Sequence, residues 1–286
     1  MFSDILLCVD FDRTLTAPDS SIPARNIEAI EYFVANGGAF TVNTGRSIPM
    51  AKAFEGKFPI SAPLLLYNGC CAYDPKTKAL TQVCPIQLDP NRFVQELEER
   101  FPALLVEIQA ADAHYLTKPD RDWEIFSEDG HCAWGYSLPS QIPGPFMKLA
   151  LYCDCSGHSV SSMYHITPQQ KEYMAQAVAY LEEKYGAYVD ACVPCAGIID
   201  IQAKGVSKGK AARRLLRELG RKRLVCVGDG ENDVSMLNEA DLAFCPADGV
   251  VADRFENVCN CAEGAVADVI YRKIPGILKL PLDKTK

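Results

Sequence analysis

Three apolar segments of this chain end directly at oxygen-bearing side chains. The run ILLCVDFD ends at Asp10 and Asp12, FTVNTG carries Thr44, and LVCVGDGEND carries Asp229 and Asp233. Short apolar runs that are bounded by glycine and followed by helical patterns are typical of buried parallel strands. In open α/β sheets, ligands bind at the carboxyl ends of such strands. We therefore predict an α/β fold in which these side chains converge on one site.

The charge balance argues against one large class of partners. Among 286 residues, 29 are Lys or Arg and 37 are Asp or Glu, which gives a net charge of −8. A nucleic-acid-binding surface needs a basic patch to meet phosphates, so we expect no nucleic-acid partner. The first residues show no basic leader, and no apolar run reaches membrane-spanning length. With 13 cysteines scattered through apolar runs and loops, these features predict a cytoplasmic protein without a membrane partner.

The pattern of elements changes twice along the chain. Strand and helix patterns alternate over 1–83, the segment 84–192 has the mixed pattern of an α+β domain, and the alternation returns over 193–286. We predict a core made of the first and last segments, with the middle segment inserted as a separate domain. Two consecutive α/β domains are the alternative, but an insertion explains why acidic strand ends lie on both sides of the middle segment. We expect a monomer or a small homo-oligomer.

Local signals also predict several helices. The segment IPARNIEAIEYFVANGG has apolar residues at helical spacing and ends at a pair of glycines. Thr167 begins a capping box, with proline at the first helical position after it. The patterns further predict helices over 47–57 and 207–219.

The acidic strand ends indicate a hard cation. Asp10 and Asp12 are two residues apart at a strand terminus, so both can face the same side and share a cation. Aspartate also ends strands for purely structural reasons, but a second acidic pair, Asp229 and Asp233, makes that explanation insufficient. Mg²⁺ commonly binds through one or two carboxylates while it contacts a substrate phosphate. We therefore predict a Mg²⁺ site.

Two further positions indicate an anion. Lys208 stands in the first turn of a predicted helix, where its charge opposes the helix dipole unless an anion lies beside it. Thr44 and Gly45 stand at a strand-to-helix turn and offer a hydroxyl and backbone amides to a phosphate. An ordinary helix cap is an equally good explanation for Thr44 alone.

Other phosphate and nucleophile motifs do not fit. GVSKGK has the wrong glycine spacing for a Walker sequence, and GDGEND has Asp233 where a dinucleotide fingerprint has its last glycine. All 4 histidines lie in the middle segment, so a serine triad in the sheet domain is not expected, although the inserted domain could contribute a histidine.

Four segments in order, DFDRTLT, VNTGR, GVSKGKA and GDGENDVSML, resemble the motifs of haloacid dehalogenase (HAD) superfamily phosphatases. YNG near Asn68 and AEGAV near Gly264 are similar to features of the Cof-like type IIB subgroup. The resemblance implies a Rossmann-like core with a mostly parallel sheet and an inserted α+β cap. It also implies Mg²⁺-dependent hydrolysis of a small phosphomonoester, with sugar phosphates as the leading class.

The resemblance assigns the chemistry to Asp10 and Asp12. Asp10 would attack phosphorus and form an aspartyl-phosphate, which divides a difficult displacement into two steps. Asp12 would protonate the leaving oxygen and then deprotonate the attacking water.

The resemblance also assigns the binding groups. Thr44, Gly45 and Lys208 would hold phosphoryl oxygens. Mg²⁺ would be bound by Asp10, the Asp12 carbonyl and Asp229. Asp233 would support the metal through water or through Lys208. Asn232 would bind phosphate or metal-bound water.

One position departs from the subgroup pattern. Arg13 replaces the glycine that usually follows the second aspartate. If this position needs a positive φ angle, Arg incurs a cost that Gly does not. Its guanidinium could instead reach the substrate, and the sequence leaves both explanations open.

Substrate selection is expected in the inserted domain. A sheet domain that holds only the phosphoryl group cannot distinguish leaving groups, so we expect one or two contacts from a set of polar and aromatic side chains. The candidates are Arg121, Trp123, His131, Trp134 and Lys148. A phosphomutase with the same intermediate and a non-catalytic phosphometabolite sensor are the alternative functions.

Overall fold

The computed structural model describes residues 1–129, 132–153 and 166–278. The chain divides into two compact units. The first comprises Met1–Gly45, Phe54–Thr81 and Ser207–Lys286, and the second comprises Arg46–Ala53 and Gln82–Val206. In the described part of the chain, no helix has both the length and the apolar character needed to cross a membrane.

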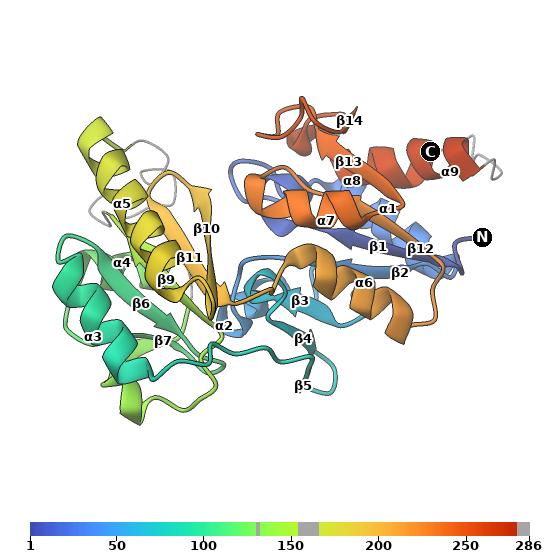
Figure 1. Ribbon diagram of the computed structural model, residues 1–286. Coiled ribbons are helices and arrows are strands. Elements are labelled where there is room, and N and C mark those ends of the chain that lie inside the picture. The colour runs from blue at the N-terminus through green and yellow to red at the C-terminus, as the bar shows by residue number, and fades with distance from the viewer. Residues whose placement is uncertain (130–131, 154–165, 279–286) are drawn as a thin grey trace. The chain divides into compact units, whose positions relative to one another are not determined.

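A parallel sheet forms the centre of the first unit (Figure 1). Its strands lie in the order β14-β13-β12-β1-β2, and every neighbouring pair is parallel. The strands are β1 (Ile5–Val9), β2 (Ala39–Val42), β12 (Arg223–Val227), β13 (Leu242–Pro246) and β14 (Glu256–Val258). Every residue of β1 and β2 is buried, as expected for apolar runs covered on both faces. The predicted α/β fold with a mostly parallel sheet is confirmed.

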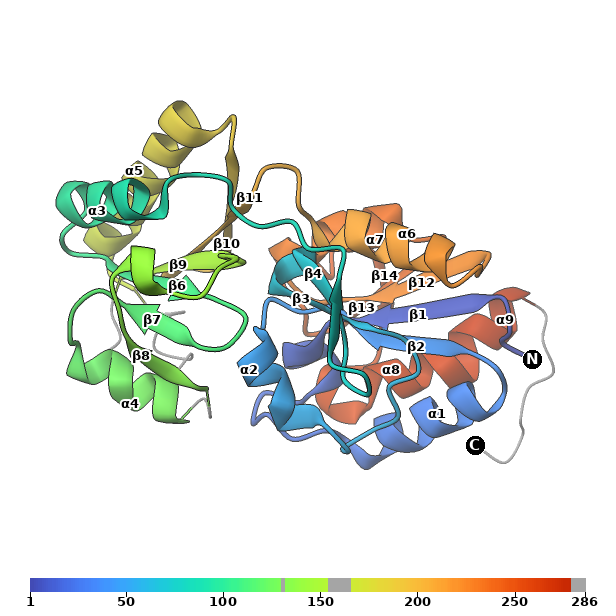
Figure 2. The ribbon, with the colours of Figure 1, turned by 90° about the horizontal axis from the view of Figure 1, so that it is seen from below.

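Helices cover both faces of this sheet (Figure 2). One face carries α1 (Ala24–Ala35), α8 (Ala265–Asp268) and α9 (Ile274–Leu278), and the other carries α6 (Lys208–Glu218) and α7 (Val234–Glu239). Apolar side chains of α6 and α7 pack on β1 and β12 in one buried cluster. Burial of this apolar surface fixes the start of α6 beside the carboxyl ends of β1 and β12.

A small antiparallel sheet extends the first unit. Its strands are β3 (Leu64–Leu66), β4 (Cys71–Asp74) and β5 (Ala79–Thr81). Asn43, directly after β2, makes a parallel bridge to Leu65 of β3. The chain end of β2 is therefore tied to the turn that follows β3.

The second unit contains a sheet in the order β10-β11-β9-β6-β7-β8 (Figure 2). All its pairs are antiparallel except β7 with β8. Its strands are β6 (Leu105–Gln109), β7 (His114–Leu116), β8 (Trp134–Tyr136), β9 (Lys148–Tyr152), β10 (Val189–Cys195) and β11 (Ile198–Ala203). Its helices are α2 (Ile48–Ala51), α3 (Pro90–Arg100), α4 (Arg121–Asp129) and α5 (Pro168–Tyr185). Side chains of α3 and α5 form the main core with this sheet.

Most helix predictions match the structure. Ser207 caps α6, because its hydroxyl accepts from the Lys210 amide at 3.2 Å. The predicted capping box at Thr167 is present at the start of α5. The prediction of one helix over 47–57 is wrong, since α2 ends at Ala51 and a single 3₁₀ turn follows over Lys52–Phe54.

The two units follow boundaries different from those of the predicted domains. β11 pairs with β9 and β10, so the second unit continues to Val206 instead of ending at 192. The short segment Arg46–Ala53 also groups with the second unit. Pairing between strands distant in sequence leaves no local signal, which explains why the extension to Val206 was not predicted. The division into a core and an inserted domain over 84–192 stays a prediction.

Candidate active site

Three buried carboxylates meet at the carboxyl ends of β1 and β12. These strands pair in register, with Val9 opposite Val227, and the amide of Asp10 donates to the Val227 carbonyl at 2.9 Å. Asp10 and Asp229 therefore leave neighbouring strands at the same edge of the sheet. Together with Asp233 they form a group in which one carboxylate oxygen from each lies within 4.8 Å of the others.

Lys208 lies against this group. Its ammonium is 2.6 Å from Asp10 Oδ1 and 2.6 Å from Asp233 Oδ1, and the side chain is fully buried. The Lys208 backbone carbonyl accepts from Asn43 Nδ2 at 2.9 Å, which ties the start of α6 to the end of β2. The sequence predicts an anion beside Lys208. In this structure, the negatively charged groups beside it are the carboxylates of Asp10 and Asp233.

Asp233 also orders the loop that carries Asp229. Its Oδ2 accepts from the backbone amides of Asp229 and Gly230, both at 3.0 Å. Gly228 permits this close approach, because a Cβ there would lie 2.6 Å from the Asp233 Cβ. Asp229 Oδ1 in turn accepts from the Thr14 hydroxyl at 2.9 Å.

The pKa shifts of the carboxyls reflect burial first and the neighbouring negative charges second. Burial and the neighbouring Asp233 raise the pKa of Asp229 to about 7, and the same two causes raise the pKa of Asp10 well above its usual value. Burial alone would lower the pKa of Lys208, but the carboxylates of Asp10 and Asp233 outweigh it and raise that pKa. One ammonium cannot neutralise three carboxylates, so the donor set fits a divalent cation with oxygen ligands. In the described residues this is the only such group of acidic, histidine or cysteine side chains.

A second set of residues lies around the turn after β3. The Thr44 amide donates to the Leu65 carbonyl, and the Thr44 carbonyl accepts from the Asn68 amide at 3.0 Å. Asn68 Oδ1 accepts from Asn232 Nδ2 at 3.5 Å, the outer limit for such a bond. A Cβ on Gly45 would lie 3.0 Å from that same oxygen, so the backbone at Gly45 approaches Asn68 closely. The structure thus brings Thr44, Gly45 and Asn232 together through Asn68.

The loop after Asp10 contains a residue with a positive φ angle, one of the two explanations that the sequence leaves open for position 13. Arg13 adopts φ 62° and ψ 9°, a left-handed conformation that costs a non-glycine residue roughly 1 kcal/mol. Its amide donates to Thr16 Oγ1 at 3.1 Å, and its side chain is exposed. Asp12, one residue earlier, is more exposed than Asp10.

Sequence reasoning missed Thr14 and Asn43, which hold Asp229 and the start of α6. Both carried a signal. Thr14 lies within the first acidic motif, and Asn43 is itself the first polar residue after the apolar run of β2. Asn68 was noted only through the resemblance, whereas the structure places its side chain beside Asn232.

The side chains of the second unit that the sequence predicts as substrate contacts lie in different environments. Trp123 is fully buried, and its indole N–H donates to Glu107 Oε2 at 2.6 Å. Trp134 packs edge-on against it at 5.7 Å between ring centroids. Arg121 is exposed and pairs with the neighbouring Glu124. Lys148 is buried, and His131 lies outside the described residues.

The second unit also holds a serine, a histidine and a glutamate in contact. Ser47 Oγ is 2.8 Å from His114 Nε2, and His114 Nδ1 is 3.2 Å from Glu107 Oε1. Burial opposes the charge on both titrating groups, but their attraction outweighs it. The pKa of His114 rises to about 9, and that of Glu107 falls to about 2. A histidine that stays protonated at neutral pH cannot act as a general base, so this is a structural ion pair rather than a catalytic triad.

The ion pair predicts how stability depends on pH. The pKa of His114 is raised to about 9 by folding, so its contribution is complete below the unfolded value of about 6.5 and is lost as pH rises through 9. We expect wild type to lose on the order of 2 kcal/mol of unfolding free energy between pH 6.5 and 9.5 relative to His114→Gln. Urea unfolding at both pH values measures this, and parallel pH profiles for the two proteins would contradict the assignment.

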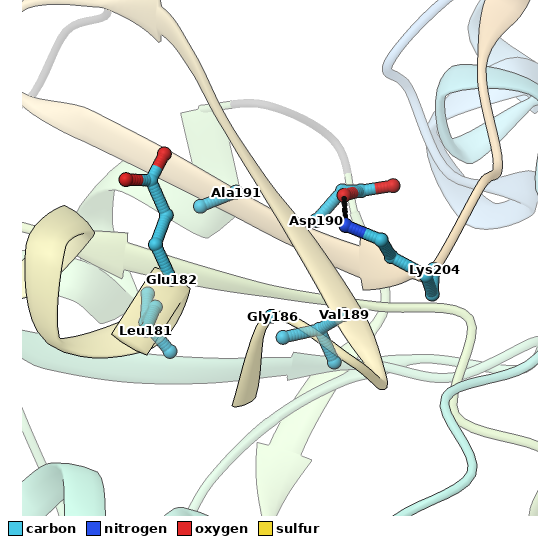
Figure 3. A pocket seen from close by; sticks show the side chains of 7 residues that line it. All are labelled: Leu181, Glu182, Gly186, Val189, Asp190, Ala191 and Lys204. Carbon is cyan, nitrogen blue, oxygen red and sulfur yellow. Dashed lines mark hydrogen bonds and ion pairs between the residues drawn. The ribbon is translucent and has the colours of Figure 1, made fainter. Parts of the chain in front are cut away.

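A separate hollow lies in the second unit near the end of α5 (Figure 3). It has a volume of about 300 Å³ and is lined by Leu181, Glu182, Gly186, Val189, Asp190, Ala191 and Lys204. One of its two carboxylates is already engaged, because Asp190 Oδ1 accepts from Lys204 Nζ at 2.6 Å and Oδ2 accepts from the Gly205 amide at 2.7 Å. We therefore place no chemistry there.

Comparisons with known proteins agree with the motif pattern. A family model described as haloacid dehalogenase-like hydrolase matches residues 7–252. A protein of Arabidopsis thaliana named "Endoribonuclease YBEY, chloroplastic" is 35% identical over 92% of this chain, but the match spans only 45% of that protein. The HMP-PP phosphatase of Serratia proteamaculans is 22% identical, over 81% of this chain and 80% of its own.

Solved structures show the same fold. The structure of an HAD subclass IIB sugar phosphatase superposes with a TM-score of 0.73 at 18% identity. The match covers 95% of this chain and 99% of that one.

Proposed function

Because this chain belongs to the haloacid dehalogenase-like hydrolases, we propose that it is a Mg²⁺-dependent phosphatase that hydrolyses small phosphomonoesters through an aspartyl-phosphate. The match of the family model over residues 7–252 confirms the resemblance drawn from the four motifs. Family membership supports the reaction class, and the site geometry supports the assignment of roles to individual residues.

One observation carries the proposal. Lys208 contacts Asp10 and Asp233 at 2.6 Å each inside a group of three buried carboxylates. A site built only for stability has no need of such repulsion, since well-packed apolar residues would serve as well or better. A site that binds a cation and a phosphoryl group needs this density of charge.

Asp10 and Asp12 carry the covalent chemistry in this proposal. Asp10 attacks phosphorus, the bond to the leaving oxygen breaks, and Asp12 gives that oxygen a proton. Asp12 then takes a proton from the water that attacks the aspartyl-phosphate and releases phosphate. The greater exposure of Asp12 supports this division, because a proton donor must reach both the leaving group and water.

The remaining residues bind and orient. Lys208, Thr44 and the Gly45 amide hold phosphoryl oxygens, and Asn232 binds phosphate or a water beside it. Asp10, Asp229 and the Asp12 carbonyl would hold Mg²⁺, while Asp233 supports it by fixing Lys208 and the Asp229 loop. Bound Mg²⁺ would supply positive charge against the charge that develops on the phosphoryl group.

The names of the relatives support a small substrate. One relative is an HMP-PP phosphatase, and one structural neighbour is a sugar phosphatase. We infer a small phosphomonoester, with sugar phosphates as the leading class. The endoribonuclease name belongs to a protein of which this chain spans less than half, so we base no activity on it.

The test is phosphate release from a panel of sugar phosphates and other small phosphomonoesters, with Mg²⁺ and with EDTA. We expect turnover that requires Mg²⁺ and yields the free alcohol. An isomerised sugar phosphate without free phosphate would indicate a phosphomutase instead. Tight binding of panel members without any product would indicate a sensor, and either result would contradict the hydrolase proposal.

A further inference from the structure

The loop after β1 holds an arginine in a backbone conformation that suits glycine. Arg13 has φ 62° and ψ 9°, and glycine reaches this left-handed region without the steric cost that a Cβ atom imposes. The side chain of Arg13 is exposed, so its burial does not offset that cost. Strained residues of this kind cluster at functional sites, which directs attention to what the side chain does.

Hydrogen bonds on both sides of Arg13 hold the loop in place. The Arg13 amide donates to Thr16 Oγ1 at 3.1 Å, and the Thr16 amide donates to the Phe11 carbonyl at 3.0 Å. Between them, the Thr14 hydroxyl donates to Asp229 Oδ1 at 2.9 Å. Both threonines are buried. The neighbours therefore fix the conformation at position 13, and the side chain starts from a defined place beside Asp229.

The Arg13 side chain lies at the edge of the parallel sheet where its strands end. The loop Phe11–Leu15 contacts the turn Cys261–Glu263, which follows β14. Burial raises the pKa of both Asp229 and Cys261, and the positive charge of Arg13 acts against this rise in each. The guanidinium is therefore within electrostatic range of both groups. Ligands bind at this edge in open α/β sheets.

The order of the residues places Arg13 on the leaving-group side of the reaction. In the proposed function, Asp10 attacks phosphorus and Asp12 gives a proton to the leaving oxygen, so the leaving group lies beside Asp12. Arg13 is the next residue, and both Asp12 and Arg13 are more exposed than Asp10. The organic part of the substrate therefore comes within reach of an arginine side chain.

The chemistry of the guanidinium defines the group that it binds best. It stays charged at every working pH, and its planar set of N–H donors matches the two oxygens of a carboxylate or a phosphate. A neutral hydroxyl would accept from one donor and make no use of the charge. In the proposed function Lys208 already holds the phosphoryl group at Asp10, so the charge of Arg13 suits a second anionic group.

We propose that Arg13 binds a second anionic group of the substrate, a carboxylate or a phosphate carried by the leaving group, and so selects phosphomonoesters that contain one. This inference rests on the proposed phosphatase function and adds a residue that determines specificity. Among the small phosphomonoesters it favours phosphorylated hydroxy acids, phosphorylated sugar acids and sugar bisphosphates.

The test uses two pairs of substrates that differ in the second anionic group. D-Glycerate 3-phosphate has a carboxylate where sn-glycerol 3-phosphate has a hydroxymethyl group, and fructose 1,6-bisphosphate has a phosphate where fructose 6-phosphate has a hydroxyl. We would measure kcat and KM for wild type, Arg13→Gln and Arg13→Gly, since glycine accepts the positive φ angle without strain. Arg217→Gln is the control, because Arg217 is exposed in the last turn of α6.

We expect both Arg13 variants to lose about tenfold to a hundredfold in kcat/KM on the substrates with a second anionic group, the equivalent of one charged hydrogen-bonded contact. The loss should lie mainly in KM, because the contact forms in the bound substrate and persists in the transition state. Both variants should remain close to wild type on the other member of each pair, and Arg217→Gln should match wild type on all four. A loss confined to one pair would identify the anionic group as a carboxylate or a phosphate.

Three results would overturn the inference. Equal losses within each pair would show that Arg13 only adjusts the electrostatic field at the reaction centre. No loss on any substrate would show that its side chain does not meet the substrate. A preference that Arg13→Gln loses and Arg13→Gly keeps would belong to the conformation of the loop and not to the guanidinium.

A binding measurement separates this inference from the proposed function. If wild type hydrolyses none of the four compounds, the phosphatase proposal is contradicted, and calorimetric titration with D-glycerate 3-phosphate in the presence of Mg²⁺ then tests Arg13 alone. We expect wild type to bind this compound at least about tenfold more tightly than Arg13→Gln, and both proteins to bind sn-glycerol 3-phosphate alike. Equal affinities of the two proteins for D-glycerate 3-phosphate would refute the role of Arg13.

Discussion

Asp10→Asn is expected to lower the rate of phosphate release on the order of 10⁴-fold while leaving the protein folded. Asparagine has nearly the same shape as aspartate, but its neutral amide is a far weaker nucleophile than a carboxylate. The substitution also removes one of three mutually repelling carboxylates, and Lys208 keeps its 2.6 Å contact with Asp233. Activity should therefore vanish without a matching loss of stability.

The matched control is Asp253→Asn, which makes the same chemical change at an exposed position of the first unit. Phosphate release and thermal unfolding would be measured on all three proteins. The control should behave like wild type in both. Activity in Asp10→Asn within about tenfold of wild type would remove Asp10 from the role of nucleophile.

Lys208→Met is expected to lower the unfolding free energy by about 3–5 kcal/mol at pH 8 and to abolish activity. Methionine fills a similar volume, so packing is largely kept. The ammonium that contacts Asp10 and Asp233 is lost, and buried carboxylates are left without a counter-charge. The group that holds phosphoryl oxygens in our proposal is lost with it.

The size of this loss should depend on pH in a defined direction. Burial and Asp233 already raise the pKa of Asp229 to about 7 and that of Asp10 well above its usual value. A carboxyl with a raised folded pKa takes up a proton as pH falls, so its repulsion of neighbours fades at low pH. The deficit of Lys208→Met relative to wild type should therefore be smaller at pH 5.5 than at pH 8.

Urea unfolding of wild type and Lys208→Met at the two pH values measures both the loss of unfolding free energy and its dependence on pH. Lys210→Met is the control, since Lys210 lies two positions along α6 with its side chain exposed. Addition of Mg²⁺ should restore part of the stability of Lys208→Met at pH 8, because a bound cation supplies the missing charge. Equal stability of Lys208→Met and wild type at pH 8 would contradict the proposed charge balance.

The sequence could predict the site in the first unit because its signals are local. Apolar runs that stop at Asp10 and Asp229 mark strand ends, and parallel pairing of β1 with β12 brings such ends together. Lys208 in a first helical turn indicated a neighbouring anion. The parallel sheet, the start of α6 and the capping box of α5 follow from patterns within a few residues.

The parts that could not be predicted depend on contacts between distant segments. The place of β11 in the second unit follows from its antiparallel pairing with β9. The two strands are far apart in the sequence, since β9 begins at Lys148 and β11 begins at Ile198. The ion pair of His114 with Glu107 joins two strands and leaves no spacing signal. The helix α4 lies in a stretch rich in proline, glycine and tryptophan, and its Trp123 is buried beside Glu107. Tertiary packing decided these positions.

The most direct test of the central claim is to trap the phosphorylated enzyme. The protein would be mixed with a ³²P-labelled sugar phosphate and Mg²⁺, quenched in acid within one turnover, and the labelled peptide identified by mass spectrometry. We predict a label on Asp10 that hydroxylamine removes, as expected of an acyl phosphate, that persists longer in Asp12→Asn, and that is absent in Asp10→Asn. Phosphate release without labelled protein, or a label on another residue, would contradict the aspartyl-phosphate mechanism.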